Sequence, residues 1–378
     1  MASLSLLIIG RPVRMQKRRG TMPAIASVGV VTPPHQVSQN TARDFVQNLF
    51  QQDFRDIERL MPIFASSQID TRYFCQPIEW FAESHSWEEK NSLYIRHAIT
   101  MSKQAIQNCL QKAGLTPQDI DHLVYVSTTG ISTPSIDAHL INELGMKSNV
   151  KRTPIFGLGC AGGVAGLARG YDLAKAHPHE RVLICCVELC GLTFMQQDRS
   201  KSNLIATGLF ADGAAAVLVT GDEVPTAQNQ EPQGQPTIIA TRSTLFPDTM
   251  DVMGWDIRDD GLKVIFSKDI PTLIGTMIQP EIHRFLADQG LCASELSSVI
   301  AHPGGMKVLM AYEESLGLPS EMLTHAREVL RTRGNMSSCT VLYVMEKELT
   351  GAAHREGDYG LVLSLGPGFS CEQVLIRW

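Results

Sequence analysis

Cys160 is the residue of this chain best placed to act as a nucleophile. It lies in the run Gly157-Leu158-Gly159-Cys160-Ala161-Gly162-Gly163, between an apolar segment at 154–156, read as a short buried strand, and an apolar stretch with helical spacing at 164–174. The start of a helix presents unpaired N–H groups and a partial positive charge, which favour a thiolate over a thiol. The glycines let a substrate approach the sulfur closely. A buried structural cysteine is the alternative, because most unpaired cysteines are buried.

Two further residues could complete a site for acyl transfer. His302 ends the apolar run 296–301 and precedes Pro-Gly-Gly, so it stands where the backbone turns at a strand end. Asn335 follows Gly334 directly before a helical segment, where on its own it is most simply a helix N-cap. A thiolate can attack a thioester while histidine and asparagine side chains donate hydrogen bonds to an oxyanion. The three residues together predict acyl transfer.

Papain-like cysteine proteases use the same residue types in the same chain order. Those enzymes carry a Cys-Gly-Ser-Cys-Trp type of signature near the mature N-terminus. The segment around Cys160 has neither that signature nor that position in the chain. We therefore set a protease aside.

The composition of the whole chain excludes several other classes. Apolar residues make up 44% of the 378 residues and charged residues 19%, a balance that can bury a sizeable core. A net charge of −6 gives no overall attraction to nucleic acid or to an anionic membrane, and no apolar run reaches the roughly 20 residues of a membrane span. The nine cysteines are scattered without disulfide or zinc-site spacing, which predicts reduced thiols, no metal and a cytoplasmic protein.

The first 22 residues predict a disordered N-terminal extension. The apolar run 6–9 precedes the basic residues, whereas a secretory signal has its charges first. Met15 and Met22 are alternative translation starts, and a weak membrane-surface role for this extension is another possible reading.

Strands and helices alternate through two halves of similar style, 23–221 and 237–378. The first half predicts strands at 24–31, 122–127, 154–156, 181–188 and 213–220, and helices at 41–60, 88–112 and 134–144. The second half predicts strands at 237–242, 296–301, 359–365 and 373–376, and helices at 271–289, 321–331 and 336–348. Residues 222–236, rich in Pro, Gln, Glu and Asn, predict a connector, and the helix at 41–60 is expected to break near Asp53. The alternation predicts a layered α/β fold with mixed sheets.

The two halves also repeat one local feature. Gly159 to Gly163 opens a helix in the first half, and Gly334 to Ser338 opens one in the second. If a pseudo-two-fold relates the halves, both helix starts point into one central cavity. Cys160 and Asn335 would then face each other.

Five motifs resemble those of the type III polyketide synthases, the chalcone and stilbene synthase relatives. They are Gly157–Gly163, Leu209–Ala216, Ala301–Gly305, Gly334–Ser338 and Gly366–Phe369. The resemblance spans residues 22–378 and implies a thiolase-like duplicated αβαβα layered fold. Residues 128–136 and 253–256 look more like the bacterial alkylpyrone and alkylresorcinol synthases than the plant enzymes.

This resemblance implies a role for each residue of the catalytic set. Cys160 matches the nucleophile that holds the starter and the growing polyketide as a thioester. His302 and Asn335 match the pair that binds the malonyl thioester carbonyl and stabilises the enolate formed when carbon dioxide leaves. His302 would also hold Cys160 as an ion pair near neutral pH. Decarboxylation itself generates the carbanion, so no metal or redox cofactor is implied.

Two positions match the family's gatekeepers. Phe210 matches the aromatic gatekeeper between the coenzyme A tunnel and the cavity. The second gatekeeper, a phenylalanine in the family, aligns with Val264, which would widen the entrance or change how the malonyl group is oriented.

The resemblance also implies a cavity wall. Its side chains are Thr128, Thr129, Thr133, Cys190, Thr193, Trp255 and Ser337, and its backbone parts are Gly304, Gly305, Gly366, Pro367 and Gly368. Trp255 stands where plant enzymes have a small glycine and would shorten the pocket. Thr133 stands where plant members donate a methionine across the dimer interface, and with Cys190 it could open a side channel for a long alkyl chain.

Coenzyme A contacts are less completely matched. Arg59 matches one of the family's basic residues at the tunnel mouth, while two other basic positions fall on Pro62 and Ser66. Lys307, just after the His-Pro-Gly-Gly turn, is a candidate for contact with the pantetheine or a phosphate. A surface lysine without a role is the alternative.

The resemblance implies an iterative acyltransferase and a homodimer. It would condense malonyl-CoA onto an acyl-CoA starter on Cys160, preferably a long fatty one, and cyclise the product to alkylpyrones, alkylresorcinols or both. An initiating β-ketoacyl synthase is one alternative, but that family usually has His-Gln-Ala-Asn and Gly-Asn-Thr-Ser where this chain has His-Pro-Gly-Gly and Gly-Asn-Met-Ser. A non-catalytic acyl-binding protein on the same fold is another, which the intact catalytic set argues against.

Overall fold

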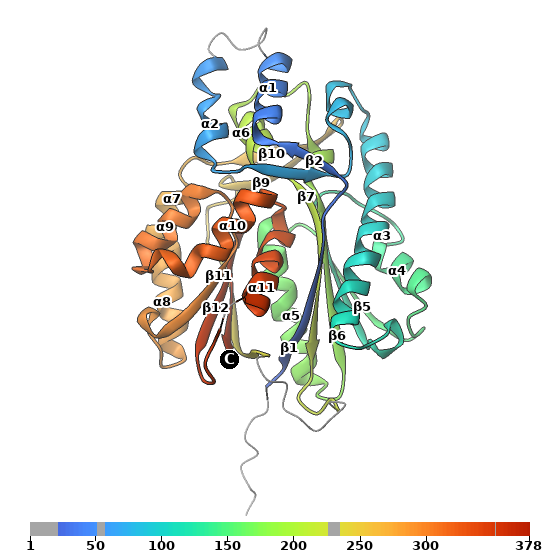
Figure 1. The fold of residues 1–378 in the computed structure, drawn as a ribbon, viewed down its shortest axis with the longest axis vertical. Coiled ribbons are helices and arrows are strands. Elements are labelled where there is room, and N and C mark those ends of the chain that lie inside the picture. The colour runs from blue at the N-terminus through green and yellow to red at the C-terminus, as the bar shows by residue number, and fades with distance from the viewer. Residues whose placement is uncertain (1–21, 51–56, 226–234, 352) are drawn as a thin grey trace, which may run out of the picture.

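A large mixed sheet with helices on its faces organises the molecule. The computed structural model describes residues 22–50, 57–225, 235–351 and 353–378. Nine strands follow the order β11-β12-β13-β8-β1-β7-β6-β4-β5. Helices α5 (Gly162–Ala176) and α11 (Thr340–Gly351) lie between the two halves of this sheet (Figure 1). The layers are those of the thiolase-like fold.

The first half of the sheet surrounds strand β6. Strands β4 and β5 lie parallel to each other and β4 lies parallel to β6, whereas β7 is antiparallel to both β6 and β1. The bounds are β1 Ala24–Val31, β4 His122–Val126, β5 Lys151–Ile155, β6 Arg181–Leu189 and β7 Asp212–Thr220. Buried apolar side chains run almost without interruption along β4, β6 and β7, which is typical of strands covered on both faces.

The second half repeats this pattern of directions. Strand β13 is antiparallel to both β8 and β12, and β12 is parallel to β11. The bounds are β8 Thr237–Leu245, β11 Leu296–Ala301, β12 Tyr359–Gly366 and β13 Ser370–Arg377. The series β8-β13-β12-β11 therefore matches β1-β7-β6-β4. Helices α5 and α11 precede the equivalent strands β6 and β12, as expected for a duplicated unit.

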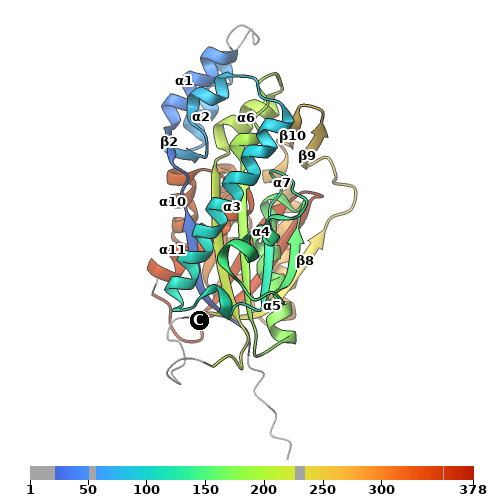
Figure 2. The ribbon, with the colours of Figure 1, turned by 90° about the vertical axis from the view of Figure 1, so that its right-hand side faces the viewer.

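Outer helices cover the two halves of the sheet. Helix α3 (Trp87–Lys112) begins with a Ser86/Glu89 capping box and packs with α4 (Ile136–Leu144) against the first half, on the side that Figure 2 turns toward the viewer. The second half is covered by α7 Ile270–Leu273, α8 Gln279–Asp288, α9 Met306–Leu316 and α10 Thr324–Arg333. Helices α1 Gln39–Phe50, α2 Pro62–Ser66 and α6 Lys201–Leu209 gather at one end of the molecule (Figure 1).

Two small hairpin-like sheets complete the fold. They pair β2 (His35–Ser38) with β3 (Thr71–Phe74), and β9 (Met253–Arg258) with β10 (Gly261–Phe266). None of these four strands follows from the sequence patterns above. Each is short, and its pairing partner is chosen by tertiary contact as much as by local preference.

Several predicted elements differ from the observed ones. The segment 154–156 is not a buried strand, because β5 is an edge strand and Phe156 is 53% exposed. Of the helix predicted at 41–60, residues 41–50 belong to α1 and 57–59 form a 3₁₀ turn, while the expected break at Asp53 lies outside the described residues. The helix predicted at 336–348 starts only at Thr340, after a 3₁₀ turn. The helix predicted at 271–289 contains a π-helical turn at 274–278.

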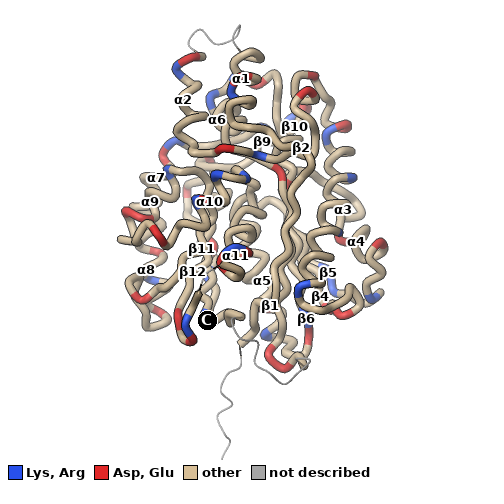
Figure 3. The backbone as a smooth tube through the Cα atoms, in the orientation of Figure 1, with Lys and Arg blue, Asp and Glu red and all other residues tan. Residues whose placement is uncertain are grey.

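Charged residues lie mainly on the outer helices and loops, and few lie on the central strands (Figure 3). In the part of the chain that the structure describes, no helix is both long and apolar enough to cross a membrane. The predicted extension, apart from Met22, and most of the predicted connector at 222–236 lie outside the described residues.

Candidate active site

The nucleophile candidate stands on a tight turn at the start of α5. Residues Gly159–Ala161 form a 3₁₀ turn, and Gly157 and Gly159 adopt φ of 89° and 47°, which glycine reaches without strain. The Gly159 N–H donates to Thr128 Oγ1 at 3.1 Å, and the Ser364 hydroxyl donates to the Cys160 carbonyl. The turn is therefore held from both halves of the molecule, and Cys160 itself stays partly exposed.

The two helix starts predicted to face each other are in direct contact. A Cβ atom added to Gly163 would overlap the Ser338 carbonyl oxygen, and one added to Gly366 would overlap the Ala161 side chain. Only glycine allows this close approach of the Cys160 turn to the Asn335 turn and to the end of β12. The glycines of these motifs thus bring the two halves together at the site.

Asn335 is fixed by both its backbone and its side chain. Its N–H donates to the Leu209 carbonyl at 2.9 Å, and its carbonyl accepts from Ala211 N–H at 2.8 Å. Its side-chain Oδ1 accepts from Ser337 N–H at 2.8 Å, and Nδ2 donates to the Gly304 carbonyl at 3.0 Å. Asn335 therefore combines a local capping role with a side chain that lines the catalytic cavity.

His302 extends the parallel ladder of β11 and β12 by one residue, because its N–H donates to the Leu363 carbonyl at 2.8 Å. The imidazole is buried, and neither ring nitrogen has a hydrogen-bond partner among the described residues. Burial lowers the pKa of His302 to about 3. The side chain is thus neutral at pH 7 and offers both ring nitrogens to a bound substrate.

The thiol of Cys160 is held in its protonated form in the free protein. Burial raises its pKa to about 12, and the negative charge of Glu188 raises it further, while hydrogen bonds with Ser337 and Asn335 lower it. The same burial opposes an imidazolium at His302. These effects disfavour the thiolate–imidazolium pair that the family resemblance implies for the free protein, because each charge would have to leave water. Activation of the thiol therefore requires proton transfer to a nearby base.

One cavity brings the predicted catalytic residues together. It encloses about 610 Å³ and is lined by Cys160, His302, Asn335 and Ser337, together with Gly304, Pro367, Phe210, Trp255 and Val264. The three catalytic candidates come from the start of α5, the end of β11 and the turn after α10. These sequence-distant segments meet at the ends of parallel strands, where α/β proteins form their sites.

Phe210 and Trp255 form an aromatic gate in this cavity. Their ring centroids lie 5.9 Å apart, and Val264 pairs directly across the hairpin with Trp255. Buried Arg72 fixes the gate by donating to the Phe210 carbonyl at 2.8 Å. The family has a large phenylalanine side chain at position 264. In this chain the large aromatic side chain is instead that of Trp255, directly opposite Val264 on the paired strand.

A second, mostly apolar cavity adjoins the first and shares the gate residues Phe210, Trp255 and Val264. It encloses about 670 Å³ and extends beneath α1. Its wall is lined by Ala42, Phe45, Val46, Phe74, Ile78, Phe81 and Phe194, with Cys190 and Thr193 near the gate. Cys190 and Thr193 therefore line this second cavity and not the one that holds Cys160.

Some predicted wall residues line neither cavity. Thr128 and Thr129 are buried behind the Cys160 turn, where their polar groups bond to Gly159 and Glu188. Thr133 is exposed in the single chain, and its predicted place across a dimer interface stays a prediction. Gly305, Gly366 and Gly368 are also absent from both linings, as are the exposed coenzyme A candidates Arg59 and Lys307. Thr128 thus holds the Cys160 turn through Gly159, and Thr129 holds Glu188.

Glu188 is the buried residue that the sequence analysis missed. Its carboxylate accepts hydrogen bonds from Thr128 N–H at 3.1 Å, Thr129 Oγ1 at 2.9 Å and Ser338 Oγ at 2.7 Å. It therefore links the segment that holds the Cys160 turn to the start of α11. The available signal was an acidic residue in the otherwise apolar strand 182–189.

Replacing Glu188 with glutamine is expected to weaken the pH dependence of stability. Burial raises the pKa of Glu188 from 4.5 to about 7, so the folded protein binds more protons than the unfolded chain in this window. The contribution of Glu188 to stability is complete below pH 4.5 and falls as the pH rises through about 7, by up to about 3 kcal/mol. Glutamine cannot lose a proton in this way, so the stability of the Glu188→Gln variant should not show this decrease with pH. Urea unfolding at about pH 5 and about pH 8 measures the difference.

Glu295→Gln, at an exposed position, is the matched control and should keep the wild-type pH dependence. If Glu188→Gln loses stability in parallel with the wild type over this range, Glu188 is not the titrating group.

Comparisons with known proteins show the family of the chain. Residues 11–223 match the family model for the N-terminal domain of chalcone and stilbene synthases, and residues 237–378 match the model for their C-terminal domain. A chalcone synthase-like protein of Bacillus subtilis (strain 168) is 44% identical over 362 residues, which cover 94% of this chain and 99% of that protein. The 1,3,6,8-tetrahydroxynaphthalene synthase of Streptomyces peucetius is 38% identical over 360 residues, covering 95% of this chain and 94% of the relative.

A solved structure shows the same fold. The crystal structure of 1,3,6,8-tetrahydroxynaphthalene synthase from Streptomyces coelicolor, a bacterial type III polyketide synthase, superposes with a TM-score of 0.87 at 29% identity. The match covers 94% of this chain and 99% of that chain. The chain therefore belongs to the chalcone and stilbene synthase family and is a type III polyketide synthase, an acyltransferase that condenses malonyl-CoA.

Proposed function

We propose that the enzyme condenses malonyl-CoA with a long-chain fatty acyl-CoA starter and releases alkylpyrones, alkylresorcinols or both. The observation that carries this proposal is the apolar cavity beneath α1, which shares its gate residues with the catalytic cavity. An alkyl chain is the part of such a starter that an apolar wall would bury.

Loading begins at Cys160. The sulfur attacks the thioester carbonyl of the starter and forms a new C–S bond, while the bond to coenzyme A breaks. The thiol proton passes to His302, whose ring nitrogens have no other partner among the described residues, and leaves with the coenzyme A thiolate.

Extension uses His302 and Asn335 as hydrogen-bond donors. The imidazole N–H of His302 and the side-chain amide of Asn335 bind the carbonyl oxygen of malonyl-CoA. Loss of carbon dioxide leaves an enolate, whose negative oxygen the same two donors stabilise. The enolate carbon attacks the acyl group on Cys160, and the Cys160 thiolate leaves. The step needs no added oxidant, reductant or metal, because decarboxylation supplies the electron pair.

The gate between the cavities explains how a long chain could stay attached to Cys160 and still leave room for malonyl-CoA. Phe210, Trp255 and Val264 contact both spaces. With Val264 small, the alkyl chain would pass beside Trp255 into the cavity beneath α1. Cys190 is a lining residue of that cavity in the single chain, and Thr133 is not.

A panel of acyl-CoA starters, from acetyl to stearoyl and including aromatic ones, tests this proposal with malonyl-CoA and mass spectrometry of the products. Each methylene buried contributes about 0.8 kcal/mol, so kcat/KM should rise roughly fourfold per buried methylene until the cavity is full. The Ala42→Phe variant should lower the rate with palmitoyl-CoA about tenfold or more and leave butanoyl-CoA within about twofold.

Thr41→Phe, exposed on the same helix, is the control and should leave both starters unchanged. Equal rates for Ala42→Phe and wild type on palmitoyl-CoA would place the alkyl chain elsewhere. Products from short or aromatic starters alone would exclude the long-chain assignment.

A naphthalene product is a second candidate, because the Streptomyces peucetius relative is named a 1,3,6,8-tetrahydroxynaphthalene synthase. The same assay with malonyl-CoA alone would reveal it as an aromatic product without a starter. Turnover only with an acyl carrier protein would instead favour the initiating ketoacyl synthase.

We also propose a cytoplasmic homodimer with coenzyme A bound near Arg59 and Lys307. All nine cysteines are unpaired, as in a reducing compartment, and the exposed apolar Ile131 and Phe156 offer a surface for a second copy. Sedimentation of a monomer at micromolar concentration would contradict the dimer.

A further inference from the structure

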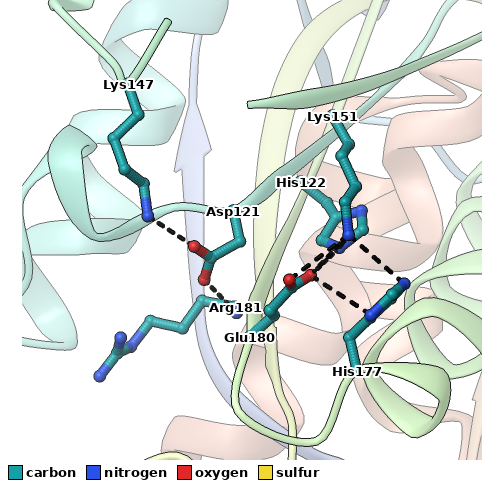
Figure 4. Close-up of polar contacts among 7 residues, drawn as sticks. All are labelled: Asp121, His122, Lys147, Lys151, His177, Glu180 and Arg181. Atoms are coloured by element: carbon teal, nitrogen blue, oxygen red, sulfur yellow. Dashed lines mark hydrogen bonds and ion pairs between the residues drawn. The ribbon is translucent and has the colours of Figure 1, made fainter. Parts of the chain in front are cut away.

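A cluster of metal-ligating side chains lies at the end of the sheet away from the catalytic cavity. Among the described residues, ligand atoms of His122, His177 and Glu180 lie within 4.8 Å of one another. His122 begins β4, His177 directly follows α5, and Glu180 directly precedes β6. Figure 4 shows the three side chains converging on the ammonium group of Lys151, the first residue of β5.

The centre of this cluster already attracts a cation. Lys151 Nζ lies 3.4 Å from Nε2 of His122 and 3.4 Å from Nε2 of His177. It also lies 3.1 Å and 3.3 Å from the two carboxylate oxygens of Glu180. Three potential metal ligands, one from β4 and two from the loop between α5 and β6, thus surround one positive group.

His122 Nε2 and Glu180 Oε2 are direct hydrogen-bond partners. His122 is buried, and a neutral imidazole is the form of histidine that metals bind.

The cluster is pre-arranged by its neighbours. His122 and Lys151 are direct partners in the β4–β5 ladder. Asp121 accepts from Arg181 N–H at 2.8 Å, which fixes the residues next to His122 and Glu180 relative to each other. The more exposed His177 and Lys151, with side chains 42% and 49% exposed, can move to admit an ion or to leave it.

We propose that His122, His177 and Glu180 form a binding site for a divalent transition metal ion of the Zn²⁺ class, which binds when the Lys151 side chain swings out. Two imidazoles and one carboxylate, with water in a fourth position, suit tetrahedral Zn²⁺. Mg²⁺ and Ca²⁺ fit poorly, because they require more oxygen ligands than the cluster offers.

Such an ion would act on stability and not on catalysis. Cys160 lies just before α5 and His177 just after it, and 15 helical residues at about 1.5 Å each separate them. Bound metal would join the end of α5 to the starts of β4 and β6. An ion that binds only the folded chain raises the apparent stability with its concentration.

Zinc binding to the full chain, stripped with a chelator, tests the site by calorimetry with ZnCl₂. We expect one ion per chain in the wild type. Lys151→Met removes the competing charge and should tighten binding about tenfold or more. In the Lys151→Met background, His177→Gln should weaken binding about tenfold or more, because it removes a ligand. CoCl₂ should give the absorption of a tetrahedral nitrogen- and oxygen-ligated ion.

His179→Gln in the same background is the matched control. His179 lies two residues from His177, but it is exposed and pairs with Glu223 outside the cluster, so its loss should leave the affinity within about twofold. The site is refuted if Lys151→Met binds Zn²⁺ no better than wild type, or if His177→Gln binds as well as His179→Gln. A strong thiolate-to-cobalt band would also refute it, because the ion would then be on cysteine.

Discussion

Replacing Cys160 with alanine is expected to abolish acyl loading and to lower product formation at least about a thousandfold. The reason is that the thioester on this sulfur holds the chain during every extension, and alanine offers no atom to form it. Intact-protein mass spectrometry after incubation with acyl-CoA measures loading, and product masses measure turnover. The wild type should gain one acyl group, and Cys160→Ala none.

Cys292→Ser is the control for this experiment. Cys292 is exposed and bonds only locally, to Ser294 and Glu295, so its removal should leave one acyl group per chain and wild-type turnover. Stable single acylation of Cys160→Ala would show that another group is the nucleophile. The other cysteines are buried, and burial raises the pKa of most of them, including Cys190, so they are poor candidates.

His302→Ala and Asn335→Ala are expected to slow malonyl-CoA decarboxylation about a hundredfold to a thousandfold, the size of effect seen when one oxyanion donor is lost. In both variants the acyl loading of Cys160 should fall less than decarboxylation. The loss of loading should be smaller in Asn335→Ala than in His302→Ala, because the Asn335 amide takes no proton from the thiol. Release of labelled carbon dioxide measures decarboxylation, and the mass shift of the protein measures loading in the same sample.

Conservative variants separate the chemical role from a structural one. His302→Gln keeps one hydrogen-bond donor and should recover part of the decarboxylation lost in His302→Ala. Asn335→Asp keeps the acceptor for Ser337 N–H but loses the donor, and should stay as slow as Asn335→Ala. Decarboxylation at the wild-type rate in either alanine variant would refute the assigned roles. Equal losses of loading and decarboxylation would indicate a disturbed fold instead.

Local sequence signals were sufficient for much of the fold. The mainly apolar segments 24–31 and 296–301 predicted β1 and β11 with their observed bounds, because apolar and β-branched residues between turn residues are a local signal for a strand. Helix α3 was found to within one residue, since its amphipathic spacing and its capping box lie within the segment itself.

Local sequence signals were also sufficient to find the residues that meet in the catalytic cavity. Cys160, His302 and Asn335 each stand at an end of an element beside glycines, and this combination of residue type and position is local. The sequence indicated that the glycines let another group approach the backbone closely. The structure shows that segments distant along the chain make this approach at Gly163 and Gly366. Sequence alone could name them and could not say what they touch.

Tertiary structure decided which polar groups face substrate. Thr128 and Thr129 were predicted in the cavity wall, but they bond to Gly159 and Glu188 behind it. Glu188 lies on a buried strand, where its cost of burial is offset by three donors from two separate segments. No local pattern records such partners, because they are distant along the chain.

The gate, the apolar cavity and the His122 cluster likewise exist only in three dimensions. Trp255 and Val264 are neighbours because the register of the β9–β10 hairpin pairs them. The cavity beneath α1 is lined by side chains from α1, β3 and the gate, which are far apart in the sequence. His122, Lys151 and Glu180 share no recognisable spacing, yet parallel strands align their starts at one sheet end. The sequence by itself determined the family, the candidate catalytic residues and most strands, since these depend on local order. The shape of the substrate space and the partners of buried charges were decided by packing between distant segments.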